Sequence, residues 1–537
     1  MSSRGESVEK FRSLSPAEFF YRNREIAGFS NPSRALYQTV RELVENSLDA
    51  CDNHGILPTV RITIFPENTK ENHYRVTVSD NGIGIPPRYV PQAFGKVLFG
   101  SKYKLRQTRG TFGLGAKMAI LYGQITTGKP VEVRTSPKGS QYSYFFKIMI
   151  DIEKNEPIVM ERRIMKRKSK RHGTTVSVVV EGDWSRARSR ILEYIKRTAM
   201  GIPYATITII TPEKEAYKYS RVIRKMPPPP REVKPHPRGV DIEMLKAIIA
   251  STKSSTLKDM LKNAFQSIGK KSAEILLEEA GIDPNKDPRK LTLDEITALV
   301  SSMRKYNKYR PPRTDALSPL GKDIIEAGLK GVLKPEFAYA VTRKPSSYSG
   351  HPFIVEVGVA YGGEVPLSPD KGPILYRFAN KIPLLYDEGS DVCWKVVSDA
   401  NFNWRQYNVK LPDRIAVLVH ICSTKIPYKG VGKESIADVP EIEREVRNAV
   451  KEAARHLRLY LSKKIRAEEE KRKIMTLVKY VPEVARSLSI LSKPPASDGN
   501  PVDYESIKSV LMKIIERRAR KIDGLNIDLR ELIIDVG

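Results

Sequence analysis

The spacing of apolar residues in and before the stretch from Arg41 to Ala50 predicts an amphipathic helix, because they recur every three or four positions. One face of this helix is expected to pack inward, and it carries Leu36, Val40, Leu43, Val44 and Ser47. A separate narrow stripe, traced at about 100° per residue, holds Glu42, Asn46 and Asp49. Asn31 and Pro32 supply a cap and a first-turn proline. The helix therefore buries one face and presents two carboxylates and an amide elsewhere.

Alternating apolar and polar residues predict strands at 60–65, 74–79 and 174–180, and further strands at 353–360 and 415–421. Asp80 follows the second strand and points to the same side as Val76 and Val78. A carboxylate on the covered face of a sheet needs a partner. Gly82 and Gly84 then let the backbone bend sharply and approach something flat or charged. Together with the polar stripe, this stretch suggests a nucleotide site.

Proline-rich breaks divide the chain into predicted units. Pro227 to Pro230 end a first mixed helix-and-strand unit, residues 1–227. Residues 228–306 are predicted to be helical, with one helix ended by Gly281 and Pro284 and another begun by a capping box of Thr292 and Glu295. A second mixed unit, residues 307–473, extends across the Pro311-Pro312 break.

The C-terminal part of the chain is predicted to be mostly helical. A long helix runs from Glu441 to about Arg466, with apolar residues at three- and four-residue intervals. The tail, residues 474–537, holds two more predicted helices, at 475–488 and 506–521. The last of these has an apolar stripe that docks either on its own domain or on a partner subunit. Both alternatives stay open.

Composition and charge narrow the class of protein. The chain has 537 residues, of which 92 are basic and 62 acidic, and its formal charge is +30. Such a field favours a polyanion as partner. No stretch of about twenty apolar residues and no apolar signal segment is present, so we expect a soluble, cytoplasmic, nucleoid-associated protein without membrane contact. Three scattered cysteines support neither a disulfide framework nor a zinc cluster.

A glycine-rich stretch follows the two polar motifs, and its residues are Gly110, Thr111, Phe112, Gly113, Leu114, Gly115, Ala116 and Lys117. Gly110 and Gly115 have the spacing of a P-loop, but Ala116 separates Gly115 from Lys117, and Met118 replaces the Ser or Thr that would hold magnesium. The register required for that phosphate cradle is therefore absent. A Gly173-Thr174 pair opening the strand at 174–180 is a fourth element.

Taken singly, these motifs have ordinary explanations. A polar stripe on a helix is usually a solvated face, and Asp-Asn-Gly is a common turn. Their joint order is the signal. Helical Glu42-x-x-x-Asn46-x-x-Asp49, Asp80-x-Gly82-x-Gly84, the glycine-rich lid and Gly173-Thr174 resemble the four motifs of the GHKL ATPases. The resemblance implies an α+β fold with an ATP-binding α/β sandwich, the Bergerat fold.

The resemblance also implies roles for individual residues. Asp80 would accept from the adenine amino group, with Thr174 helping through water, and Asn46 would hold Mg²⁺. Glu42 would act as general base on the attacking water. Lid amides would cradle the phosphates. The expected nucleotide-binding set is Asn46, Asp49, Asp80, Gly82, Gly84, Gly110, Thr111, Gly113, Leu114, Gly115, Lys117, Thr174 and Lys433.

Lys433 enters through the second mixed unit, which resembles the transducer domain of related GHKL machines. In those relatives a transducer lysine reaches the terminal phosphate, and the glycine-flanked loop before the long helix offers Lys433, with Lys425 and Lys429 behind it. The helical insert resembles the helix-two-turn-helix module. Five lysines would make it basic: Lys253, Lys258, Lys262, Lys270 and Lys271. It is either a nucleic-acid contact or a small spacer.

The order of ATPase, helix-two-turn-helix insert and transducer with a long C-terminal helix resembles the B-subunit family of archaeal-type DNA topoisomerase VI, a type IIB enzyme. This implies ATP-driven homodimerisation through the segment before Asn31, capture of double-stranded DNA, and cleavage by a separate A subunit in an A2B2 heterotetramer. Three alternatives would share part of the chemistry: a mismatch-repair-like or chaperone-like clamp without a cleaving partner, a non-hydrolysing scaffold, and a sensor kinase. Co-purification with a cleaving subunit separates the first of these from a topoisomerase.

Overall fold

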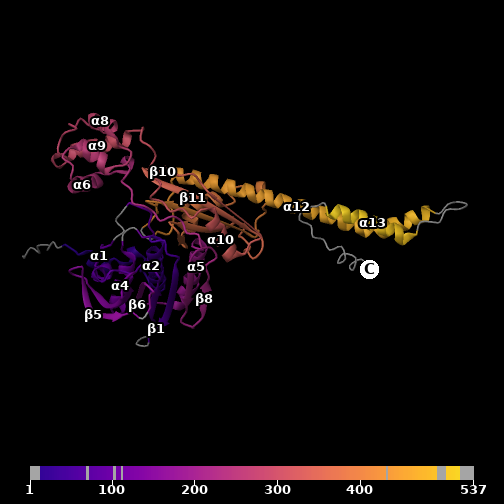
Figure 1. Cartoon of the computed structure of the whole chain (residues 1–537), viewed down its shortest axis with the longest axis horizontal. Helices are drawn as coiled ribbons and strands as arrows, with labels where there is room; N and C mark the ends of the chain where they lie inside the picture. Colours follow the sequence, from indigo (N-terminus) through magenta and orange to yellow (C-terminus); the bar gives the residue numbers. More distant parts are fainter. Residues whose placement is uncertain are drawn as a thin grey trace, which may run out of the picture. The chain divides into compact units, whose positions relative to one another are not determined.

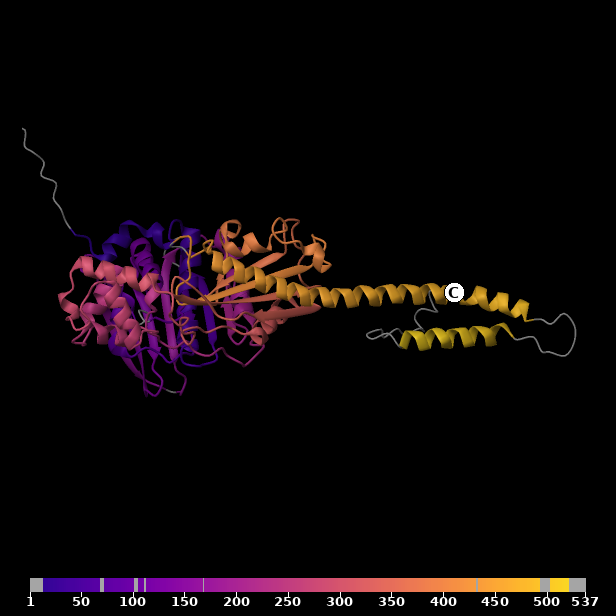
Figure 2. The same ribbon diagram turned by 90° about the horizontal axis from the view of Figure 1, so that it is seen from above.

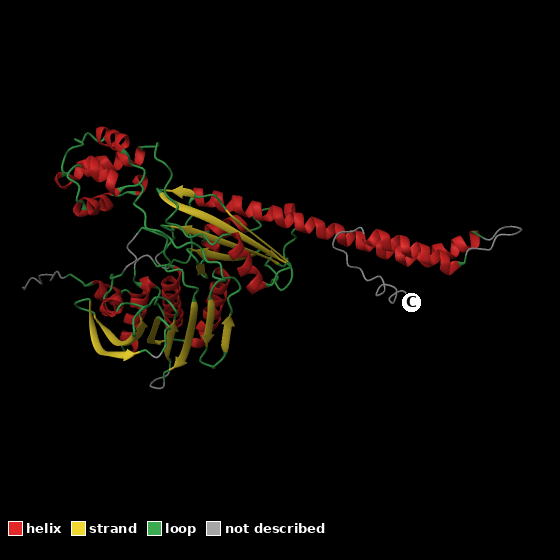
Figure 3. Cartoon of the chain, viewed as in Figure 1, coloured by secondary structure: helices red, strands yellow, loops and turns green. Residues whose placement is uncertain are grey.

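The computed structural model describes residues 13–67, 72–100, 105–110, 113–167, 169–430, 433–492 and 503–520. Within these residues the N-terminal part forms an eight-stranded sheet in the order β5-β4-β3-β6-β2-β1-β7-β8 (Figure 3). Neighbouring strands are antiparallel except β1 and β7. The strands are β1 Thr59–Pro66, β2 His73–Ser79, β3 Val131–Ser136, β4 Tyr142–Asp151, β5 Glu156–Lys166, β6 Gly173–Glu181, β7 Thr206–Ile210 and β8 Ala216–Tyr219.

Helix α2 packs against both α4 and α5, and the three helices cover this sheet (Figure 1). The helices of this part are α1 Pro16–Arg22, α2 Pro32–Asp52, α3 Val90–Gly95, α4 Gly115–Thr127 and α5 Trp184–Gly201. The predicted start of α2 is confirmed, because the Asn31 side chain accepts from the Arg34 amide at 2.9 Å and Pro32 is the first helical residue. The predicted inward face of α2 is buried as well. The packing of α2 against α4 and α5 positions its polar stripe, Glu42, Asn46 and Asp49, beside the hydrophobic core.

The helical insert has a hydrophobic core of its own. Its helices are α6 Ile242–Ser251, α7 Leu257–Ala264, α8 Lys270–Glu279 and α9 Leu293–Lys305. The core residues include Leu245, Leu261, Phe265, Leu276 and Leu299. The predicted capping box is confirmed at α9, where the Thr292 amide donates to Glu295 at 2.8 Å.

A second, six-stranded sheet carries the predicted transducer (Figure 3). Its order is β10-β11-β14-β12-β13, with β9 also paired to β11, and the pair β12 and β14 is parallel. The elements are α10 Lys322–Leu333, β9 Phe337–Thr342, β10 Ser346–Tyr348, β11 His351–Tyr361, β12 Ile374–Ala379, β13 Ile382–Leu384, α11 Val392–Val397 and β14 Ile415–Ser423. Residues of α5, α10 and β12 share one hydrophobic core, so the ATPase-like part and the transducer are packed together.

The C-terminal helices differ from the prediction. One continuous helix, α12 Pro440–Leu491, replaces the two expected at 441–466 and 475–488. Residues 467–473 are Ala, Glu, Lys and Arg, all good helix formers, so nothing there ends the helix. α13 Tyr504–Arg520 lies beside the later part of α12, with Ile515 against Ile474, Val478 and Val481 (Figure 2).

The chain divides into two compact units. One comprises Met1–Asn403 and Leu411–Ala453, and the other comprises Trp404–Lys410 and Ala454–Gly537. The predicted domain boundaries at 227, 306 and 473 stay predictions. Over the described part of the chain, no helix combines the length and apolar character needed to cross a lipid bilayer.

Candidate functional site

Asp80 lies at the end of β2, beside the first residues of β6. Its Oδ1 accepts from the backbone amides of Gly82 at 2.8 Å and Thr174 at 3.1 Å, and its own amide donates to the Thr174 carbonyl at 2.9 Å. Burial raises the pKa of Asp80, against the opposing effect of these N–H donors and of the Ser47 hydroxyl. The structure therefore brings Asp80, Gly82 and Thr174 together, as the sequence predicted.

The loop after Asp80 requires glycine at position 84. Gly84 has a φ of +73°, and a Cβ there would lie 2.5 Å from the carbonyl oxygen of Ser136. Any side chain would push the loop away from β3. The tight approach keeps the Gly82 amide aimed at Asp80.

Glu42 projects from α2 onto the first residue of α4. A Cβ on Gly115 would lie only 1.6 Å from Glu42 Oε2, so the carboxylate occupies the space that a side chain there would fill. Glu42 Oε1 accepts from Gln38 Nε2 at 3.1 Å. Leu114, the residue before α4, gives no side-chain cap. The carboxylate thus lies at the first turn of α4, where helix amides attract anions, and the role of Glu42 as general base stays a prediction.

The lid residues are described in part. Thr111 lies outside the described residues, while Gly110, Gly113 and Leu114 lead into α4. The Lys117 ammonium donates to the carbonyl oxygen of Phe99 and, at 3.0 Å, to that of Gly113. Lys117 thus holds lid backbone in this structure, and its contact with a nucleotide stays a prediction.

Asn46 and Asp49 continue the stripe of Glu42 along α2, and they differ in exposure. The Asn46 side chain is half-buried. Asp49 is buried, and its Oδ1 accepts from Arg109 Nη1 at 2.8 Å. Sequence reasoning missed Arg109, although it directly precedes Gly110 at the start of the lid. The structure gives Asp49 a partner at the base of the lid, and a direct nucleotide contact by Asp49 stays a prediction.

The transducer loop brings Lys433 to α2. Its positive charge acts on Glu45 of α2, whose pKa is raised by burial and lowered in part by Arg41 and Lys433. The next residue, Glu434, pairs with Arg34 of α2 at 2.6 Å.

Two other lysines of this loop were alternatives to Lys433. Lys429 donates to the Ser390 carbonyl and pairs with Asp438 at 3.3 Å. The charge of Lys425 acts on His351, the first residue of β11. Lys433 as the lysine that reaches the terminal phosphate stays a prediction.

The helical insert carries a small excess of basic side chains. Residues 228–306 hold 14 basic and 11 acidic side chains. Lys258 pairs with Glu274, and Lys262 pairs with Asp259 at 3.2 Å. Two of the five expected lysines thus have acidic partners, and a basic surface on the insert stays a prediction.

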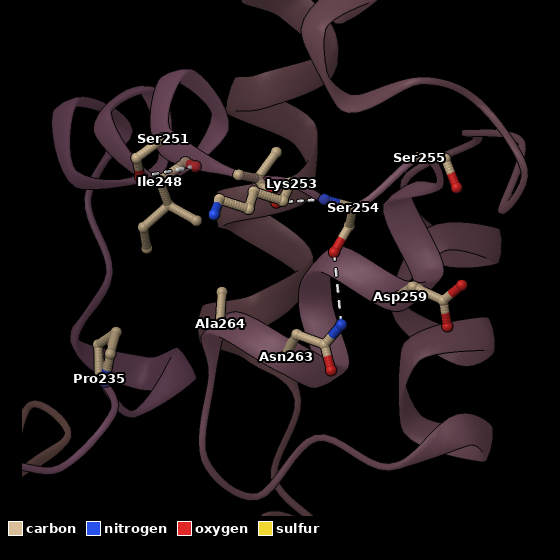
Figure 4. Close-up of a pocket in the computed structure, with 10 residues that line it drawn as sticks. Pro235, Ile248, Ser251, Lys253, Ser254, Ser255, Asp259, Asn263 and Ala264 are labelled. Carbon is tan, nitrogen blue, oxygen red and sulfur yellow. Dashed lines mark hydrogen bonds between the residues drawn. The ribbon is translucent and has the colours of Figure 1, made fainter.

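An open hollow of about 630 Å³ lies on the insert (Figure 4). Its lining is Pro235, Ile248, Ser251, Thr252, Lys253, Ser254, Ser255, Asp259, Asn263 and Ala264. Asn263 Nδ2 donates to Ser254 Oγ at 3.4 Å across it. This hollow does not include Asp80, Glu42 or the residues that contact them.

Comparisons with known proteins agree with this architecture. The model for histidine kinase-, DNA gyrase B-, and HSP90-like ATPases matches residues 31–154, and the model for the topoisomerase VI B subunit transducer matches residues 312–473. The fold and the site thus define a GHKL-type ATPase joined to a transducer.

Curated relatives extend the match over almost the whole chain. The B subunit of type 2 DNA topoisomerase 6 from Saccharolobus solfataricus is 52% identical over 522 residues, covering 97% of each chain. Its counterpart from Metallosphaera sedula is 51% identical, covering 94% of this chain and 95% of the relative. The chain belongs to the family of type 2 DNA topoisomerase 6 B subunits.

Proposed function

We propose that this chain is the ATP-driven gate of a type IIB DNA topoisomerase. The observation that carries the proposal is the contact of the Glu42 carboxylate with Gly115, at the uncapped first turn of α4. A general base and an anion-binding helix terminus meet there. The fixed carboxylate of Asp80 lies on the strand that packs beneath the same helix, α2. The expected purine contact after β2 and the expected general base on α2 thus lie on two elements that pack together.

The residues present fit ATP and Mg²⁺. In the described part of the chain no group of three or more His, Cys, Asp or Glu could hold a metal on its own. Asn46, half-buried on α2, would hold Mg²⁺ through its side-chain oxygen. When bound, Mg²⁺ offsets phosphate charge.

Each protein group then has a defined task in turnover. Asp80 would accept from the adenine amino group, and the first amides of α4 would donate to the phosphates. Glu42 would orient a water molecule and take its proton. Lys433 would pair with the terminal phosphate, so that its contact is lost on hydrolysis and the transducer is released.

The partners follow from the family and from charge. We propose duplex DNA as the polyanion that the formal charge of +30 attracts. Cleavage would belong to an A subunit, contacted through the tail, in an A2B2 assembly at the nucleoid. Two copies would dimerise through the segment before Asn31, whose first twelve residues lie outside the described residues.

Relaxation of a supercoiled plasmid tests this function. We expect relaxation only when ATP, this chain and a candidate A subunit are all present. In the same complex Glu42→Ala should abolish ATP turnover and relaxation while nucleotide binding and dimerisation persist. Glu153→Ala, an exposed residue of the β4–β5 turn, is the matched control.

Two outcomes would contradict the proposal. Full turnover by Glu42→Ala would place the base elsewhere. ATP-dependent dimerisation without relaxation, whichever cleaving subunit is added, would instead favour a clamp.

A further inference from the structure

A cluster of four buried charges lies between the ATPase-like part and the transducer. The members of this charge quartet are Asp49, Asp52, Arg109 and Lys381. Arg109 donates to Asp49 at 2.8 Å and to Asp52 at 2.6 Å, and Lys381 Nζ lies 3.4 Å from Asp52 Oδ2. Their side chains are only 3–9% exposed. The formal charges of the two acidic and two basic side chains thus sum to zero within the interior.

The balance depends on both basic residues. Although burial alone would raise the pKa of Asp52, Arg109 and Lys381 together hold it below the ordinary value. The Asp52 carboxylate is therefore charged at neutral pH. A buried carboxylate that loses one of its counter-ions is strongly destabilised. Displacement of Lys381 would therefore destabilise the charged Asp52 and its ion pair with Arg109.

The transducer side of the quartet is a rigid turn. Asn380 and Lys381 connect β12 to β13, and both have left-handed backbones, with φ of 49° and 70°. The Lys381 amide donates to His420 Nε2 at 3.1 Å, and His420 Nδ1 is 2.7 Å from the buried Glu356. These hydrogen bonds connect the turn to strands β14 and β11 of the transducer sheet.

The ATPase side of the quartet is the start of the lid. Arg109 directly precedes Gly110, and the carbonyl oxygen of Thr108 accepts from Asn380 Nδ2 at 3.2 Å. The residues that lead into the lid thus contact the transducer turn directly through Asn380, and Asp52 of α2 links Arg109 to Lys381.

We propose that Lys381 is a positioning residue for nucleotide binding: it ties the start of the lid, through Asp52 and Arg109, to the transducer. This inference rests on the proposed function, because the lid is assigned there to the phosphates. Movement of the β12–β13 turn changes the geometry of residues 108–110, and nucleotide binding in turn favours one position of the turn, since such coupling is reciprocal.

The test measures the dissociation constant of a fluorescent non-hydrolysable ATP analogue for the full chain, together with the thermal unfolding midpoint. Lys381→Met removes the charge and keeps the length of the side chain. Asp52→Asn with Lys381→Met removes both charges, so no buried ion is left without its partner. Asn380→Gly keeps the left-handed turn and removes the contact with Thr108. It also removes two hydrogen bonds between the Asn380 side chain and the Ser423 backbone, at 3.0 and 2.9 Å, so its unfolding midpoint is compared with its binding. Lys334→Met, an exposed transducer lysine paired with Glu364, is the control.

We expect Lys381→Met and Asn380→Gly to weaken analogue binding by about tenfold, within the usual range of coupling between sites. The double variant should recover the unfolding midpoint but keep the weakened binding. Lys334→Met should change neither quantity.

Recovery of both quantities in the double variant would overturn the inference, because Lys381 would then act on stability alone. Unchanged binding in Asn380→Gly and Lys381→Met would overturn it too. The assay needs no hydrolysis, so a wild-type chain that binds the analogue without turning ATP over would contradict the proposed function and leave this test intact.

Discussion

Replacement of Asp80 by Asn changes what the purine pocket accepts while hardly changing its shape. Asp80 Oδ1 accepts from two backbone amides, at 2.8 and 3.1 Å. An Asn side chain has one acceptor oxygen, whereas the carboxylate has two. If that oxygen stays on the amides of Gly82 and Thr174, the new NH₂ group faces the adenine amino group, and two donors oppose each other. The flipped rotamer places the same conflict at the two amides.

The magnitude follows from these contacts. A hydrogen bond to a charged group contributes about 1.5–3 kcal/mol, and a buried donor without an acceptor costs about 1–3 kcal/mol. We expect a loss of about 3 kcal/mol in ATP binding, which is roughly 150-fold in the dissociation constant. GTP offers an acceptor oxygen where ATP has its amino group. The preference for ATP over GTP should therefore shrink or reverse in Asp80→Asn.

Titration calorimetry with ATP and GTP analogues measures both effects, and Asp399→Asn, an exposed aspartate, is the control. Because burial raises the pKa of Asp80, the wild type should lose ATP affinity as the pH falls through that raised value. Above it the carboxylate is ionised and accepts. Asp80→Asn should lack this pH dependence. An unchanged ratio of ATP to GTP affinity would refute the assignment of Asp80 to the purine.

Three further changes test other parts of the account. Asp391→Ala should lower the free energy of unfolding by about 3–5 kcal/mol, because it strands the fully buried Arg377, 2.9 Å away; an unchanged denaturant midpoint would contradict this. Lys433→Ala should lose ATP turnover, while Lys429→Ala and Lys425→Ala should retain it. The reverse pattern would assign the phosphate contact to Lys425 or Lys429. Reversing Lys270 and Lys271 to Glu should reduce the slope of log DNA affinity against log salt by about 1.8 if both contact phosphates. An unchanged slope would leave the insert as a spacer.

Local patterns predicted the parts of the structure that are governed by neighbouring residues. The Asn31 cap, the buried face of α2, the strands β1, β2 and β6 and the α9 capping box are confirmed, because each depends on spacing within a few positions. The grouping of Asp80 with Gly82 and Thr174 is confirmed through the resemblance of four motifs in order.

Features that depend on tertiary packing were not predictable in this way. Asp52 lies three residues after Asp49 on α2, so a polar stripe there was visible, but its partner Lys381 is 329 positions away. No periodicity links them. The continuity of α12 was missed although it is a local property. Residues 467–473 lack the apolar spacing on which the helix predictions relied, but these residue types favour helix.

A structure of the full chain with a non-hydrolysable ATP analogue and Mg²⁺ would locate the nucleotide directly. We expect the adenine amino group within hydrogen-bond distance of Asp80, the ion on Asn46, and the terminal phosphate between the first turn of α4 and Lys433. An analogue bound elsewhere, with Glu42 still seated against Gly115, would contradict this expectation.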